Sequence, residues 1–166
     1  MATYRISRNI EASLIDYITT ALSNAGWTNI TVEKGFKRIY DIPVKVFTES
    51  GAICVRVETT EHDSAEVGTD NTIRTPHVFI DIFGANDGQR LDLKDFLISA
   101  IKGGLPYCEY VVNGNTVTTK TQNGRLRVLT MDDQPVSFNI DKSSLEDHDK
   151  YRHLITVTLS LGRVEA

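Results

Sequence analysis

Apolar and polar side chains alternate with a period of two residues in Val55–Glu58 and again in Val78–Ile82. This period is typical of β-strands that bury one face. The seventeen residues between these strands, Thr60–Pro76, show no such alternation. Connections of this length are uncommon in compact domains and are usually functional or disordered. We therefore expect a long hairpin arm in this part of the chain.

Helical spacing dominates two other stretches, where apolar residues recur every three or four positions. The first stretch covers residues 9–27. Asn9 is its predicted N-cap, Gly26 is the predicted left-handed residue after the last turn, and Trp27 is the apolar residue that packs back on the helix. The second stretch covers residues 88–106, with Asp87 or Asp92 as its predicted cap. Two helices are expected.

The remaining patterned segments predict strands, and turn signals separate several of them. The dipeptides Asn113-Gly114 and Asn123-Gly124 predict type I′ hairpin turns, which need positive φ at both central residues. The predicted strands are residues 29–34, 43–49, 52–59, 77–84, 107–112, 115–122, 125–131 and 153–161.

These elements predict one α+β domain over residues 1–166. We expect a largely antiparallel sheet with two helices packed on one face, a β-meander and a long hairpin arm.

Composition narrows the function classes. Of the 166 residues, 40% are hydrophobic and 24% charged, which is ordinary for a globular domain. The formal net charge of −4 argues against a nucleic-acid binder, whose surface must neutralise phosphates. Cys54 and Cys108 are expected to be buried thiols of a reducing compartment. The lack of long apolar runs predicts a soluble protein of the cytoplasm.

Two groups of charged residues are candidate interaction sites. The first lies on the sheet face opposite the aliphatic one, which is either plainly solvated or a subunit interface. The second is the arm, which is either a solvated tip or a segment that orders against a basic partner. The candidates are Arg56, Asp81 and Arg127 on the sheet, and Glu61, Asp63, Glu66, Asp70 and Arg74 in the arm.

Catalytic signatures are missing from the sequence. It contains no nucleophile elbow, no phosphate-binding glycine loop and no Cys/His cluster. Glu58 and Asp81 could bind magnesium in principle, but the Lys that restriction-type nucleases place at the next step is not there. No catalytic, cofactor-binding or metal-binding residue is predicted.

The order of segments resembles a known family. The helix ending "NAGW" precedes "IYDIPVKVFTESGAICVRVE", the arm, "PHVFIDIFGANDGQRLDLKDFLISAI", the meander and "YRHLITVTLSL". This order is similar to that of bacteriophage neck and tail-completion proteins, and most similar to tail terminators. The resemblance spans nearly the whole chain and rests on element order, not on an invariant motif.

The resemblance implies a virion protein without enzyme activity or cofactor, assembled in the host cytoplasm. Such subunits form a ring, commonly six-fold, that ends tail-tube polymerisation and joins the tail to the head connector. The implied partners are other copies of the chain, the tail tube protein and a connector or head-closure protein, with DNA only passing through the lumen and no membrane. The alternatives are another neck ring, a small metal-dependent nuclease, or a monomeric ligand-binding domain.

Overall fold

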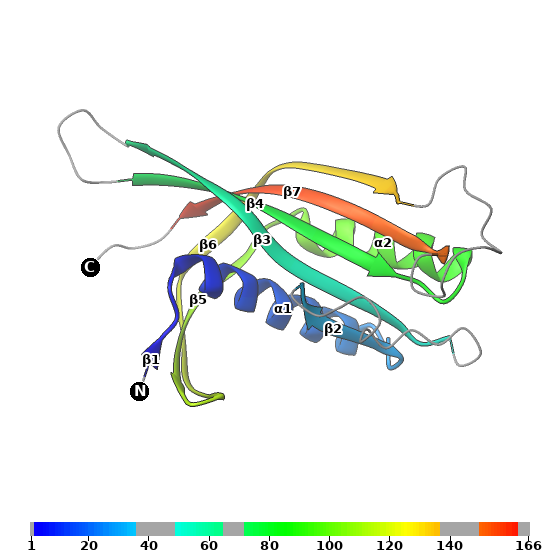
Figure 1. Cartoon of the computed structure of the whole chain (residues 1–166), viewed down its shortest axis with the longest axis horizontal. Helices are drawn as coiled ribbons and strands as arrows, with labels where there is room; N and C mark the ends of the chain where they lie inside the picture. Colours follow the sequence, from blue (N-terminus) through cyan, green and yellow to red (C-terminus); the bar gives the residue numbers. More distant parts are fainter. Residues whose placement is uncertain (1, 36–48, 65–71, 137–149, 163–166) are drawn as a thin grey trace.

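A computed structural model describes residues 2–35, 49–64, 72–136 and 150–162, and Figure 1 shows the arrangement of their elements. The two helices are α1 (Ile6–Asn24) and α2 (Asp87–Ile101). The strands are β1 (Ala2–Thr3), β2 (Ile30–Lys34), β3 (Gly51–Ser64), β4 (Thr72–Phe83), β5 (Leu105–Asn113), β6 (Thr116–Pro135) and β7 (Arg152–Gly162).

All seven strands belong to one curled sheet, in the order β1-β5-β6-β7-β4-β3-β2. Every neighbouring pair is antiparallel except β2 and β3, which run parallel. The predicted α+β class and the largely antiparallel sheet are confirmed. The strand predicted over residues 43–49 falls, up to residue 48, outside the described residues.

Both helices pack on the same face of this sheet, because their apolar residues join one core with alternate strand residues. The strand predicted over residues 153–161 is confirmed as β7, in which Ile155, Val157 and Leu159 are buried. The core contains Ile10, Leu14, Ile18 and Leu22 of α1, Leu93, Leu97 and Ile101 of α2, and Ile53, Val55, Val78, Ile80, Ile82, Ile155, Val157 and Leu159 of the sheet.

Helix α1 begins earlier than the sequence predicts. Its N-cap is Arg5, and Asn9 lies buried inside the helix, so the predicted N-cap at Asn9 is wrong. The predicted end is confirmed: Gly26 has φ of 85°, and the amide of Trp27 donates to the Leu22 carbonyl at 2.9 Å. This is the six-to-one bond of a Schellman ending. The Trp27 ring then lies 6.2 Å from that of Phe96 on α2.

The Asn9 side chain instead joins α1 to the backbone of β5. Its Oδ1 accepts from the Tyr110 amide at 3.2 Å, and its Nδ2 donates to the Tyr4 carbonyl at 3.2 Å. One turn later, the Ser13 hydroxyl accepts from the Cys108 amide at 2.9 Å. Two helix side chains therefore satisfy backbone donors at the outer edge of β5, which β1 covers only at Val111 and Val112.

Helix α2 is capped by Asn86 and not by Asp87 or Asp92. The side-chain Oδ1 of Asn86 accepts from the Gln89 amide at 2.8 Å. The Gln89 side chain in turn accepts from Ala85 at 2.7 Å and donates to the Glu49 carbonyl at 2.6 Å. Both predicted caps are therefore wrong. Asp87 is the first residue of the helix, and Asp92 lies inside it.

The two Asn-Gly dipeptides behave differently from each other. Strands β5 and β6 turn at Gly114-Asn115, where only Gly114 has positive φ (62°), the pattern of a type II′ turn. At Asn123-Gly124 the chain does not turn, and β6 is one continuous strand. Gly124 (φ 106°) instead lies where the β5–β6 register shifts between Pro106 and Cys108. Both type I′ predictions are therefore wrong, and the second dipeptide forms a bulge.

The hairpin arm exists, but most of it is regular strand. The ladder continues from Thr60 opposite Pro76 to Ser64 opposite Thr72, after a register shift at Glu58. Alternation of apolar residues could not reveal these strand ends, because among the described residues they pack against no core. Residues 65–71 lie outside the described part of the chain.

We predict that Asn9→Ala lowers the free energy of unfolding by about 2 kcal/mol, because it leaves the buried Tyr110 amide without its acceptor. Urea denaturation of the variant and the parent protein measures this. The control is Asn24→Ala, since Asn24 lies on the same helix but is exposed. Equal losses in both variants would contradict the role assigned to Asn9.

Candidate interaction surface

The sheet face away from the helices carries paired charges and rings. Arg56 on β3 lies opposite Phe79 on β4, and its guanidinium carbon is 5.1 Å from the ring centroid. The same guanidinium forms an ion pair with Glu58 at 3.0 Å. Both charged side chains are a little over one-third exposed, so the pair contributes little to stability. Arg56 and Glu58 thus lie on an accessible surface, as expected for a partner contact or a solvated face.

Asp81 lies on this face too, but it is buried, with 5% of its surface exposed. The Arg152 guanidinium of β7 donates to its carboxylate at 3.2 Å and lies over the Phe83 ring at 5.0 Å. Ala52, Cys54 and Phe83 form a small second apolar cluster there. Asp81 therefore serves an internal ion pair. No local pattern around Arg152 predicts this contact, because the position of Arg152 depends on the β4–β7 register.

Arg127 lies opposite Ser160 of β7 and is exposed. The nearby Leu129 is 57% exposed, the largest value among the exposed large apolar side chains of the described residues. Arg127 and Leu129 thus give the middle of β6 a mixed basic and apolar surface.

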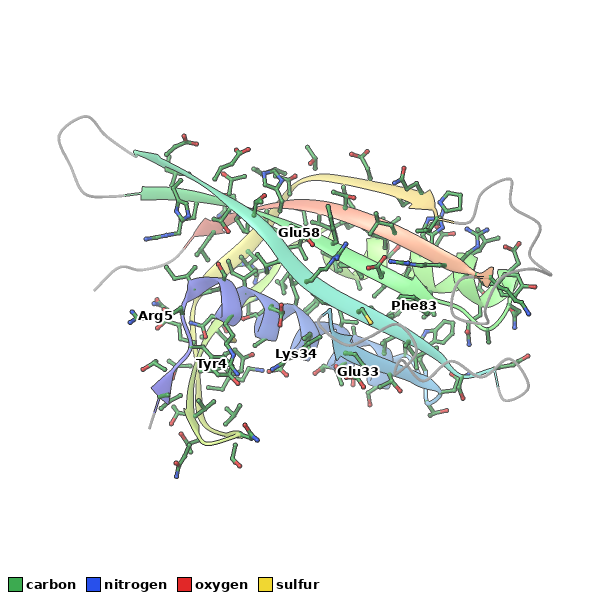
Figure 2. All side chains as sticks on the ribbon, viewed as in Figure 1. Tyr4, Arg5, Glu33, Lys34, Glu58 and Phe83 are labelled. Atoms are coloured by element: carbon green, nitrogen blue, oxygen red, sulfur yellow. The ribbon has the colours of Figure 1, made fainter. Side chains whose placement is uncertain are left out.

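The arm carries its charges on both sides. Glu61 is 3.3 Å from the His77 ring, which also lies 3.2 Å from the Thr158 hydroxyl. Asp63 is exposed. Arg74 and His62 lie opposite each other in the ladder and line a groove of about 770 Å³ with the segment that leads into α1. In Figure 2, Tyr4 and Arg5 of that segment lie near the start of α1. Glu66 and Asp70 lie outside the described residues.

The possible metal ligands do not converge in the described part of the chain. No group of three or more His, Cys, Asp or Glu side chains there is placed to hold a metal ion. Glu58 binds Arg56 and Asp81 binds Arg152, so the two acids considered from sequence are in separate ion pairs. Cys54 and Cys108 are both buried free thiols, as expected.

A buried polar network lies under α2 that sequence reasoning missed. His153 is 2% exposed, its Nδ1 is 2.7 Å from Arg90, and its Nε2 is 2.8 Å from Asp133. Because a guanidinium can only donate, Nδ1 is the acceptor and Nε2 carries the proton that Asp133 accepts. Lys94 lies 3.6 Å from the same carboxylate. The shared parity of His153 and Ile155 was the signal that could have placed this histidine on the core face.

Burial lowers the pKa of His153, and the neighbouring positive charge of Arg90 acts in the same direction, against the hydrogen bond with Asp133. That hydrogen bond lowers the pKa of Asp133. In the folded protein His153 is therefore held neutral between Arg90 and Asp133. The unfolded chain binds the imidazole proton more readily than the folded chain does.

We predict that the stability from His153 is complete above the unfolded-state pKa of about 6.5 and is lost as pH falls through the lower folded-state pKa. The difference in unfolding free energy between the parent protein and His153→Gln should shrink as pH decreases from 7.5 to about 5. Chemical denaturation across this range measures it. His62→Gln is the control, since His62 is exposed in the arm. A difference independent of pH would contradict the prediction.

No protein-family model matches this chain, and no curated protein matches it significantly in sequence. Neither helix of the described residues combines the length and apolar character needed to cross a bilayer.

Proposed function

We propose that this protein is a structural ring subunit of a bacteriophage neck, which ends tail-tube polymerisation and joins the tail to the head connector. The resemblance in element order supplies the class. The observation that carries the proposal is the arm, a paired two-stranded extension on which Glu61 and Asp63 are exposed.

The arm suits a contact between proteins better than it suits a stable monomer. Glu58–Ser64 and Thr72–Pro76 pair with each other but with no third strand in the described residues. In Figure 1 this part of β3 and β4 extends beyond both helices. An isolated two-stranded ribbon gains little stability from its own contacts. An assembly partner would give the ribbon the missing contacts.

The charges that sequence analysis singled out also suit a binding role. Arg56 and Glu58 form an accessible ion pair, and Asp63 and Arg127 are exposed, whereas Asp81 is buried in its pair with Arg152. Ion pairs on a surface mainly direct association and orientation, and they contribute less to affinity. A ring must contact its own copies laterally and different proteins above and below, so such a surface has a use in every subunit.

We predict that the purified chain self-associates with increasing concentration into a closed ring, through contacts in which different surfaces of two copies meet. Light scattering combined with size-exclusion chromatography over a wide concentration range measures the mass. A chain that stays monomeric at every concentration, and is also monomeric in the virion, would contradict the proposed function.

We predict that the double variant Glu61→Gln with Asp63→Asn slows the joining of filled heads to tails and makes the rate less sensitive to salt. Both changes follow because these acids steer a basic partner surface over a Debye length of about 8 Å at physiological salt. Joining rates at low and high salt measure the effect.

The matched control for this experiment removes the same charge elsewhere. Asp92→Asn with Asp95→Asn also removes two negative charges, from exposed positions on α2. It should leave the joining rate and its salt dependence unchanged. Equal effects of both double variants would mean that net charge matters and the arm does not.

A further inference from the structure

Unpaired strand edges invite other strands, and most edges of this sheet are protected against that. Strand β1 is only two residues long, and Asn9 and Ser13 satisfy backbone groups of β5 beyond it. Strand β2 ends on Glu33 and Lys34, and the free part of β4 contains Pro76, which has no N–H to donate. Short length, charge, proline and covering side chains are the usual forms of such protection.

One edge lacks this protection. Strand β6 pairs with β7 only from Arg125 onward, so Thr116–Gln122 has β5 on one side and no strand on the other in the described residues. Every residue from Asn113 to Gln122 is exposed, including Val117 at 46%. The segment is rich in threonine and contains no proline, a composition that favours strand pairing.

The single charge on this segment does not guard its edge. The Lys120 ammonium is turned back to the Asp16 carboxylate of α1 at 3.0 Å, and lies 5.9 Å from the Tyr110 ring centroid. Asp16 also accepts from the Tyr110 hydroxyl at 2.6 Å. A lysine that normally repels incoming strands is thus tied to its own domain. The edge of β6 presents mainly neutral side chains.

The outer edge of β3 in the arm is complementary in charge to the edge of β6. Strand β3 pairs with β2 only up to Val55, and the Glu11 carboxylate of α1 accepts from the Val57 amide, so the outer edge of β3 is free of strands and of this cover from Glu58 to Ser64 in the described residues. This edge carries Glu58, Glu61 and Asp63, so two arms repel each other. Strand β6 instead continues from its free edge into the exposed bases Arg125 and Arg127. Figure 1 shows the arm and the β5–β6 hairpin projecting at the same end of the molecule, on different sides of α1.

We propose that the free edge of β6 in one copy of this chain pairs with the outer edge of β3 in the arm of the next copy. The pairing continues the sheet from subunit to subunit through main-chain hydrogen bonds. Because the two edges differ, the contact is heterologous and each added copy keeps one free edge of each kind. Such a contact forms a closed ring when the rotation between neighbouring copies closes on itself. This inference rests on the self-association in the proposed function and names its contact.

Charge variants on the β6 edge test the pairing. Val117→Glu with Thr119→Glu places two acids against the acidic arm, and should weaken self-association about tenfold or more. The control, Val117→Lys with Thr119→Lys, places the opposite charge at the same exposed positions. Because these lysines face the acidic arm, the control should associate at least as well as the parent protein. Glu61→Lys with Asp63→Lys in the arm should restore association to the glutamate variant. Sedimentation velocity measures association, and far-UV circular dichroism verifies folding.

Amide hydrogen exchange tests the contact without any substitution. Amides of Thr116–Gln122 and Thr59–Ser64 should exchange more slowly in the concentrated, associated protein than in the dilute monomer. Association without this protection, or equal association of the glutamate and lysine variants, would overturn the inference and leave the proposed ring intact. A chain that never associates would overturn both.

Discussion

One constraint governs this fold: both helices bury their apolar stripes on the same face of a single sheet. The core formed there includes residues from α1, α2 and the central strands, and the opposite face receives only the small cluster of Ala52, Cys54 and Phe83 in the described residues. A sheet that is covered on one side can stabilise only the strand segments that cross its covered part. The outer parts of β3, β4 and β6 lie outside this core. Besides their ladder bonds they have only surface contacts, such as Lys120 with Asp16 and Glu61 with His77, and they are the parts available to partners.

The sequence predicted the parts of the fold that this core determines. The helix predicted within residues 88–106 and the strand predicted over residues 153–161 are both confirmed, because burial imposes a period on the residue types. Predictions based on a single local signal were less successful. Asn9 and Asp87 are both good caps in isolation, but Asn9 lies opposite β5, and Asn86 precedes Asp87. A tertiary contact and a neighbouring alternative decided these two positions.

The candidate surface was predictable to a similar degree. Parity placed Arg56, Asp81 and Phe79 on one face, and the ladder agrees with that placement. Parity could not separate the accessible Arg56 from the buried Asp81, since burial on this face depends on Arg152, more than seventy positions away in sequence. The free edge of β6 was hidden for another reason. The dipeptide Asn123-Gly124 predicted a turn. In the structure β6 continues through this dipeptide, and its first residues extend beyond the end of β7.

The bonds between α1 and β5 also determine when this domain can be completed during synthesis. Ser13 and Asn9 meet residues 95 and 101 positions later in the chain. Helix α1 therefore leaves the ribosome well before β5, and the side of α1 that contacts β5 stays uncovered until β5 has been made. Contacts of such long sequence separation close slowly and leave apolar surface exposed to other nascent chains. In a cell that makes many copies at once, the interval before β5 emerges is the period in which α1 is most open to aggregation.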